Sequence, residues 1–219
     1  MKKLLFLTTF VLGVSCSAWA TTACPTTPTS LSTYDTSGYT CTVDDLMFSG
    51  FQYVFGGGTS VPDADISVTP VMGTETGLTF DYIWAAGTGE SLDSDIIYTV
   101  TCDGCLISDV ELTSSGGFTG NGIASATETG TGGIFLENTY TSGTNVSFDS
   151  ATISPAASSL TLHKDIGASG IFGGTASISG VANLFSTTGN TSPVPEPPLL
   201  LLSVALLGLV PFARRKFSR

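Results

Sequence analysis

The chain has 219 residues, in which 18 acidic side chains outnumber seven lysines and arginines and give a formal net charge of −11 at pH 7. Between residues 21 and 190, Lys164 is the one lysine or arginine against 17 acidic residues, a net charge of −16. Binding to nucleic acid or to anionic lipid headgroups depends on neutralising phosphates with Lys and Arg, so the charge excludes both as partners of this region.

Residues 1–20 have the three parts of a secretory signal peptide: a basic start, an apolar run over residues 4–14, and the small residues Ala18 and Ala20 before Thr21. A signal peptidase requires small side chains three residues and one residue before its cut, which places the cut between Ala20 and Thr21. The apolar run is too short for a membrane-spanning helix. We therefore expect signal peptidase to remove residues 1–20 during export.

Four cysteines remain in the mature chain: Cys24, Cys41, Cys102 and Cys105. An even number in an exported protein indicates disulfides, for which three connectivities exist. Short loops close at the smallest entropic cost, which favours Cys24–Cys41 and Cys102–Cys105. The second pair also has the spacing of a zinc or redox motif. Its Asp-Gly centre is a hairpin turn signal between two strand-like runs, so we expect a turn closed by a disulfide.

Residues 21–185 are rich in Gly, Thr and Ser, and short runs of β-branched and aromatic residues alternate with turn residues. Where polar and apolar residues alternate, as over 78–82, one face of a strand is buried and the other is solvated. The predicted strands are 46–55, 66–71, 78–84, 96–101, 106–113, 134–140, 145–148, 159–163 and 176–185. Many short strands without helices predict an all-β fold, a single β-sandwich of the jelly-roll type.

The connections between these strands are predicted from turn residues. Glycine clusters at 56–58, 116–117, 132–133 and 173–174 are interpreted as turns. Residues 21–40, which are rich in Thr, Ser and Pro, are expected to form a loosely ordered N-terminal arm fastened by Cys24–Cys41. Residues 186–193 are interpreted as a polar linker.

Side chains for catalysis are scarce in this body. Its one histidine, His163, ends a predicted strand, where we expect a solvated side chain rather than the base of a nucleophilic set. Glycoside hydrolysis needs only two carboxylates and a cleft. Its candidates here are Asp81, Glu90, Asp93, Asp95, Asp109 and Glu111. We predict a protein without enzyme activity, with a glycosidase as the alternative that the composition leaves open.

Tyr82 and Trp84 lie two residues apart in a predicted strand, so their side chains share one face. Such a pair is a candidate platform on which a sugar ring stacks. The alternative, which we favour, is that the pair belongs to the core, as aromatic pairs on strands commonly do.

Glu90, Asp93 and Asp95 offer closely spaced oxygen ligands, and so do Asp63 and Asp65. Extracellular β-sandwiches bind calcium in acidic loops of this kind. Asp and Ser are also good turn formers, so these segments are weak calcium candidates, and the sequence indicates no other cofactor.

The C-terminal segment 194–219 begins with Val194, Pro195, Glu196 and Pro197. An apolar stretch over about 198–213 follows, close to the length of a membrane-spanning helix. It ends at a basic cluster, Arg214, Arg215 and Lys216. Positive residues stay on the cytoplasmic side of a membrane, so we expect the body to face outward from a C-terminal transmembrane helix.

These three parts in this order resemble the PEP-CTERM sorting domain of exopolysaccharide-producing Gram-negative bacteria. The resemblance implies recognition by an exosortase, a membrane-embedded cysteine transpeptidase, with processing at or near Pro195-Glu196-Pro197. It also implies passage from the inner membrane to the cell surface or the extracellular matrix, in a biofilm. The expected function is therefore that of a non-catalytic matrix protein, with a carbohydrate-binding module as the alternative and extracellular polysaccharide as the partner.

Overall fold

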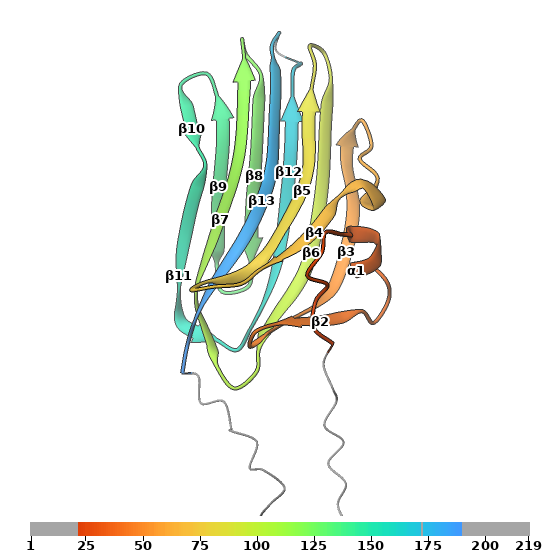
Figure 1. Cartoon of the computed structure of the whole chain (residues 1–219). Coiled ribbons are helices and arrows are strands. Elements are labelled where there is room, and N and C mark those ends of the chain that lie inside the picture. The colour runs from red at the N-terminus through yellow and green to blue at the C-terminus, as the bar shows by residue number, and fades with distance from the viewer. Residues whose placement is uncertain (1–21, 172, 190–219) are drawn as a thin grey trace, which may run out of the picture.

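The computed structural model describes residues 22–171 and 173–189, which form 13 β-strands and two short helices (Figure 1). In chain order the elements are β1 (Thr29–Ser30), α1 (Leu31–Tyr34), β2 (Thr40–Val43), β3 (Leu46–Gly58), η1 (Asp63–Asp65), β4 (Ser67–Val71), β5 (Thr76–Ala86), β6 (Ser91–Cys102), β7 (Leu106–Thr119), β8 (Ile123–Gly130), β9 (Ile134–Thr141), β10 (Thr144–Val146), β11 (Phe148–Ala157), β12 (Ser159–Ser169) and β13 (Thr175–Thr188).

The strands build two antiparallel sheets that pack face to face (Figure 1). The six-stranded sheet has the order β1-β4-β5-β13-β7-β11, and the seven-stranded sheet has the order β10-β9-β8-β12-β6-β3-β2. Eight of these strands, β5 to β9 and β11 to β13, divide evenly between the sheets. When these eight strands are numbered 1 to 8 in chain order, the order of neighbours is 1-8-3-6 in one sheet and 2-7-4-5 in the other. The predicted all-β sandwich is confirmed.

Alternation along the strands sends one set of side chains between the sheets. In β12, for example, Leu162 is buried while its neighbour His163 points outward. Aromatic rings fill the middle of the core: Phe51 stacks on Tyr98 with centroids 5.4 Å apart, and Phe80 approaches the same ring at 5.8 Å. Burying one such side chain stabilises the fold by roughly 1.5–3 kcal/mol.

The predicted strands all coincide with or overlap observed strands, but most of them are too short, and β1, β2 and β8 have no predicted counterpart. Most of β11 is also absent from the prediction. Two glycine clusters interpreted as turns belong to strands. Gly116 lies inside β7 because the chain passes close to a neighbouring ring there: a Cβ atom would lie 2.6 Å from the Tyr140 ring. Residues 56–58 end β3, whereas 132–133 and 173–174 are in turns as predicted.

The N-terminal arm is ordered, contrary to the expectation. Leu31 and Tyr34 of α1 are both fully buried, and Tyr34 packs edge-on against Phe51 with ring centroids 5.1 Å apart. The Cys24–Cys41 disulfide fastens the arm to β2. The composition, rich in Thr, Ser and Pro, suggests a loose segment. Two buried side chains and a covalent link offset the conformational entropy that the segment loses when it becomes ordered.

The two ends of the described chain, residues 22 and 189, lie at the same end of the sandwich (Figure 1). The domain extends further than residue 185, because β13 continues to Thr188 through the first part of the predicted linker. Within 22–171 and 173–189, the structure contains no helix long and apolar enough to cross a membrane. The predicted signal peptide, the rest of the linker and the sorting segment lie outside the described residues.

Candidate functional site

The outer face of the seven-stranded sheet carries a group of charged side chains on its two central strands. Asp93 and Asp95 project from β6, and His163 and Asp165 project from β12. The strand register aligns Asp165 with Asp95. Side chains two residues apart share a face of a strand. The register therefore brings the two side chains of β6 beside the two of β12, although about 70 residues of sequence separate the pairs. We call them the acidic face.

His163 lies in the middle of β12 rather than at a strand end, which corrects its expected position. Its Nε2 lies 2.8 Å from Oδ1 of Asp95. The imidazole is therefore held by a carboxylate on the neighbouring strand. Half of its side chain remains in contact with solvent, so a ligand can reach it.

Asp165 has the most perturbed carboxyl group on this face. The pKa of this carboxyl is raised to about 7: burial contributes most of the increase, and the hydrogen bond with Asp93 and the negative charges of Asp93 and Asp95 contribute the rest. The adjacent His163 acts in the opposite direction. Below neutral pH the Asp165 carboxyl therefore keeps its proton and can both donate and accept a hydrogen bond.

A pocket of about 360 Å³ opens beside this pair, and we call it the distal pocket. Asp93 and Asp165 line it together with the hydroxyls of Ser91, Ser125 and Ser169. Ser91 begins β6 and Ser169 ends β12, so the pocket lies toward the end of the sandwich opposite residues 22 and 189 (Figure 1).

Gly167 forms part of the floor of the distal pocket and pairs with Asp93 and Ser125 on the flanking strands. The absence of a side chain keeps the pocket open at this point. A Cβ atom there would meet only Leu92 O at 3.5 Å and Asp93 Oδ1 at 3.8 Å, which are ordinary contacts. The pocket can therefore be narrowed by substitution without straining the fold.

An exposed aromatic ring lies on the same outer face. Phe135 of β9 is 60% exposed, and the register places it in line with Thr129 of β8 and His163 of β12. The Thr129 hydroxyl is therefore the polar group next to the ring. An exposed ring with polar neighbours can contact sugars, because the ring packs on C–H groups while the polar groups bind hydroxyls.

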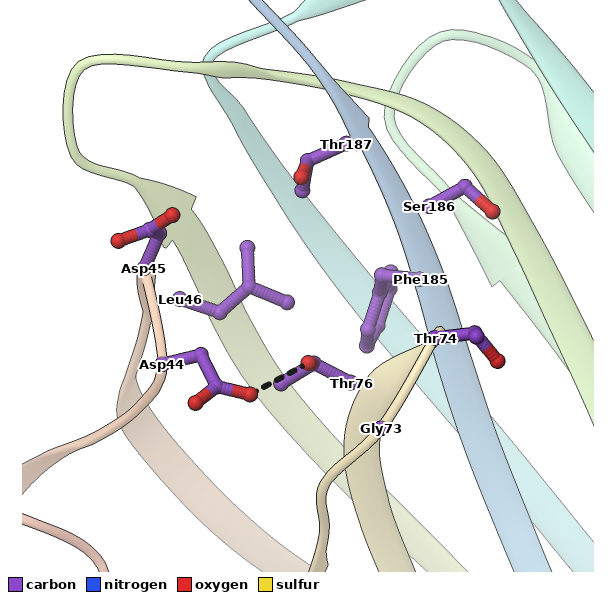
Figure 2. Close-up of a pocket in the computed structure, with 9 residues that line it drawn as sticks. All are labelled: Asp44, Asp45, Leu46, Gly73, Thr74, Thr76, Phe185, Ser186 and Thr187. Atoms are coloured by element: carbon purple, nitrogen blue, oxygen red, sulfur yellow. Dashed lines mark hydrogen bonds between the residues drawn. The ribbon is translucent and has the colours of Figure 1, made fainter. Parts of the chain in front are cut away.

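A second, larger pocket lies at the end of the sandwich that carries residues 22 and 189, and we call it the proximal pocket. Its volume is about 840 Å³. Figure 2 shows Asp44 and Asp45 on one side and residues of the β4–β5 loop and of β13 on the other. Thr76 donates a hydrogen bond of 2.9 Å to Asp44 Oδ2. The buried side chains of Leu46 and Phe185 form its apolar base.

Glu75, Asp109 and Glu111 form an acidic cluster on the outer face of the six-stranded sheet. One carboxylate oxygen from each lies within 4.8 Å of the others. Burial raises the pKa values of Asp109 and Glu111, and the charge of Glu75 adds to both increases. Asp109 and Glu111 appear among the carboxylates singled out in the sequence, but Glu75 does not, because it comes from the β4–β5 loop, which the sequence does not place beside β7.

Tyr82 and Trp84 share one face of β5, as predicted, and that face points into the core. Trp84 is fully buried, its indole N–H donates a 3.0 Å hydrogen bond to Ser94 Oγ, and its ring meets Tyr82 edge-on. A ring without exposed surface cannot stack on a sugar. The interpretation as core is therefore confirmed for Trp84, and its role as a ligand platform is wrong.

The calcium candidates do not form the expected loop. Asp93 and Asp95 lie in β6 on the acidic face, whereas the carboxylate of Glu90 turns back to accept a hydrogen bond from Gly87 N at 2.9 Å. Asp63 and Asp65 belong to η1. In the part of the chain that the structure describes, Glu75, Asp109 and Glu111 are the one group of three such side chains close enough to share an ion.

Both predicted cysteine pairs are present as disulfides, Cys24–Cys41 and Cys102–Cys105. The second closes the turn between β6 and β7, as the Asp-Gly turn signal predicts. The cleavage residues Ala18, Ala20 and Thr21, the sorting residues Val194 to Pro197 and the basic residues Arg214, Arg215 and Lys216 lie outside the described residues.

No protein-family model and no curated protein matches the chain. Among solved structures, TmCBM61 in complex with β-1,4-galactotriose shares 10% identity at a TM-score of 0.32, covering 70% of this chain and 92% of that chain. The enzymatically active domain of tailspike protein 4 from bacteriophage CBA120 shares 15% identity at a TM-score of 0.23, covering 64% of this chain and 19% of that one. Likenesses at these TM-scores say nothing about what this chain binds.

Proposed function

We propose that this chain is an exported cell-surface or extracellular-matrix protein that acts by binding rather than by catalysis. Signal peptidase removes residues 1–20, and an exosortase processes the C-terminal segment at Pro195-Glu196-Pro197 after the apolar stretch has held the protein in the inner membrane. The support for sorting comes from the resemblance of residues 194–219 to a PEP-CTERM domain.

The two cysteine pairs are the observation that carries the proposal of export. Cys24 is paired with Cys41 and Cys102 with Cys105, and three of the four residues are less than 5% exposed. Disulfides persist in oxidising compartments such as the periplasm and the cell exterior, and they are rare in a reducing cytosol. A fold fastened in this way at both its N-terminal arm and its β6–β7 turn suits the exterior.

The position of the distal pocket supports a binding role. The chain leaves the body at residue 189 toward the sorting segment, from the end of the sandwich opposite this pocket (Figure 1). A body held at its C-terminus therefore presents the distal pocket away from the membrane. The strand order, with its first–eighth–third–sixth pattern, supports the finer assignment to a jelly roll, a double-sheet fold used by many lectin domains.

The more specific candidate function is carbohydrate binding at the acidic face and the distal pocket. It is favoured by the exposed ring of Phe135 and by the hydroxyl and carboxyl groups that line the pocket. Carboxylates accept hydrogen bonds from sugar hydroxyls, and the excess of acid over base repels anionic polymers. We therefore assign uncharged polysaccharide, rather than an acidic one, as the ligand class.

The contact between Asp93 and Asp165 supports binding over hydrolysis by this pair. Asp93 and Asp165 are joined by a hydrogen bond. A glycosidase needs its two carboxyl groups about 5–10 Å apart, so that the sugar fits between them. A pair in direct contact leaves no such space and fits a role in recognition.

Binding to neutral and acidic polysaccharides by the purified full-length protein tests the carbohydrate assignment. We expect retention on one or more neutral polymers, and weaker retention for Gly167→Ala, which narrows the pocket floor without straining the backbone. Gly117→Ala, on β7 of the six-stranded sheet, is the matched control and should bind normally, because a Cβ atom there meets nothing within 4 Å. Equal binding by the wild type and Gly167→Ala, or no binding to any neutral polymer, contradicts the assignment.

Sorting is tested separately, in cells. Replacing Pro195, Glu196 and Pro197 by alanine should leave the protein uncut in the inner membrane. An unchanged C-terminus after this replacement contradicts the exosortase proposal and leaves the binding result unaffected.

A further inference from the structure

Four fully buried polar side chains meet between the two sheets. Lys164 Nζ of β12 lies 2.6 Å from Glu128 Oε2 of β8, and both side chains are 0% exposed. Asn183 of β13 donates from Nδ2 to the other oxygen, Glu128 Oε1, at 2.7 Å. Tyr98 of β6 donates its hydroxyl proton to Asn183 Oδ1 at 2.8 Å. The group thus contains an amine, a carboxamide, a carboxyl group in contact with both, and a donor on the carboxamide oxygen.

We infer that Lys164 and Asn183 become joined by an intramolecular amide bond between Nζ and the side-chain carbonyl carbon, with Glu128 as the proton carrier and ammonia as the second product. The bond is a self-modification of the folded protein. It requires no partner, cofactor or oxidant, because all reacting groups belong to this cluster.

The amine is placed to act as a nucleophile. Burial lowers the pKa of Lys164, while contact with Glu128 opposes that change. A neutral amine has the lone pair that attack on a carbonyl carbon requires, and a buried lysine loses its proton more readily than a solvated one. The Phe80 ring lies over the amine, with its centroid 5.9 Å from Nζ, and forms part of the surroundings that exclude water.

The carboxamide is placed to act as an electrophile. The Tyr98 hydroxyl donates to Asn183 Oδ1, the oxygen on which negative charge develops when the carbonyl carbon is attacked. Burial raises the pKa of Tyr98 well above its ordinary value, so its hydroxyl keeps the proton that it donates. The leaving nitrogen, Nδ2, is in contact with Glu128, which can deliver a proton to it.

The step balances within the cluster. Glu128 takes one proton from the Lys164 ammonium group, and the free amine attacks the carbonyl carbon of Asn183 to form a new C–N bond. Glu128 passes a proton to Nδ2, the old C–N bond breaks, and ammonia leaves. The new amide nitrogen returns a proton to Glu128, which ends as a neutral carboxylic acid. The ion pair has then become an uncharged amide and an uncharged acid, which suits a core without water.

The bond would connect the two sheets covalently. Lys164 lies on β12, in the middle of the seven-stranded sheet, and Asn183 lies on β13, the strand that leads to the C-terminal segment. A pull on that segment would pass from β13 directly into the opposite sheet. Such a link would also prevent the last strand from separating from the body.

Intact mass spectrometry of the reduced full-length protein tests the inference. We expect a mass about 17 Da below that of the unmodified chain, the mass of ammonia. Trypsin adds a second readout, because Lys164 is the one lysine or arginine between residues 4 and 213 and an acylated lysine is not cut. The denatured protein should therefore resist cleavage between Lys164 and Asp165. An unmodified mass with complete cleavage at Lys164 would overturn the inference.

Variants identify the reacting groups. Asn183→Ala and Glu128→Gln should abolish the mass loss and restore cleavage, and Tyr98→Phe should slow the loss. Asn138 is the matched control, since it is an equally buried asparagine that donates to Leu112 O and Ser114 Oγ, and Asn138→Ala should retain the 17 Da loss. If a cluster variant fails to fold, the wild-type mass and digest still decide the question.

Discussion

Lys164 on β12 and Glu128 on β8 are register partners in the seven-stranded sheet, and their side chains meet in the core with no exposure to solvent. Lys164 is also the one lysine or arginine between residues 22 and 189. Its burial leaves no lysine or arginine on the surface of the described body. Of the 17 acidic residues in this range, Glu128 is the one that is buried, so 16 carboxyl groups remain at or near the surface without a lysine or arginine partner.

This charge distribution predicts that salt stabilises the protein. Like charges on the folded surface repel one another, and a rise in sodium chloride from about 0.02 M to about 0.5 M shortens the range of that repulsion from roughly 20 Å to under 5 Å. We expect the thermal midpoint to rise by about 2–4 °C for each kcal/mol of repulsion that is screened. Chloride is preferred to sulfate, which strengthens apolar burial as well. A midpoint that falls or stays constant contradicts this reading of the surface.

Asp165 predicts the direction of the pH dependence. Its pKa rises from 3.8 to about 7 on folding, so between these values the folded protein holds a proton that the unfolded chain has released. The free energy of unfolding should therefore decrease as the pH rises through this window and level off above about 7. The raised pKa values of Asp81, Asp109 and Glu111 act in the same direction.

Denaturant unfolding at pH 5 and pH 8 measures this effect. Asp165→Asn should reduce the loss of stability between the two values, whereas Glu137→Gln, which removes one charge from the same face, should leave it almost unchanged. If the wild type and Asp165→Asn lose the same stability between pH 5 and pH 8, the pKa of the Asp165 carboxyl group is not raised in the folded protein.

The strands were predictable where apolar and polar residues alternate, and β8 shows why the others were not. Its inward positions hold Ala124, Ala126 and Glu128, which are small or charged and give no apolar signal. Glu128 can point inward because its carboxylate is paired with Lys164, which lies 36 residues later in the sequence. The signal for Lys164 was present, because it continues the buried series of Leu160 and Leu162 in β12.

The acidic face was predictable only in part, for a related reason. Asp93 and Asp95 resemble loop residues in sequence, but pairing with β3 and β12 makes them part of a strand. The contact of Asp95 with His163 and the contact of Asp93 with Asp165 arise from the register between distant strands. Sequence alone specifies the period of a strand and not its neighbours.

Trp84 and Phe135 are two aromatic residues for which we expect opposite roles. Trp84 is 0% exposed and Phe135 is 60% exposed. Trp84→Ala should destabilise the fold by about 3–5 kcal/mol, because it leaves a cavity in the core. Phe135→Ala should change the stability by less than about 0.5 kcal/mol and weaken binding to neutral polysaccharide. Denaturant melts and polysaccharide retention measure the two effects. A large loss of stability for Phe135→Ala would place its ring in the core instead.

The two disulfides should contribute unequally to stability. Cys24–Cys41 spans 17 residues and Cys102–Cys105 spans three. A disulfide stabilises the fold by restricting the unfolded chain. Removing the first should therefore lower the free energy of unfolding by about 3 kcal/mol, and removing the second should lower it by about 2 kcal/mol. Paired serine variants, unfolded in urea, provide the comparison. A larger cost for the shorter loop would show that contacts in the folded state outweigh chain entropy.

The central claim is that the protein is exported and then sorted through its C-terminal segment, and the masses of both ends test it directly. Mass spectrometry of the protein recovered from the surface of the cells that produce it should find Thr21 as the first residue. The chain should end within or close to residues 194–197, with all four remaining cysteines in disulfides. A chain that retains residues 1–20, or one that continues unbroken to Arg219, would contradict the account.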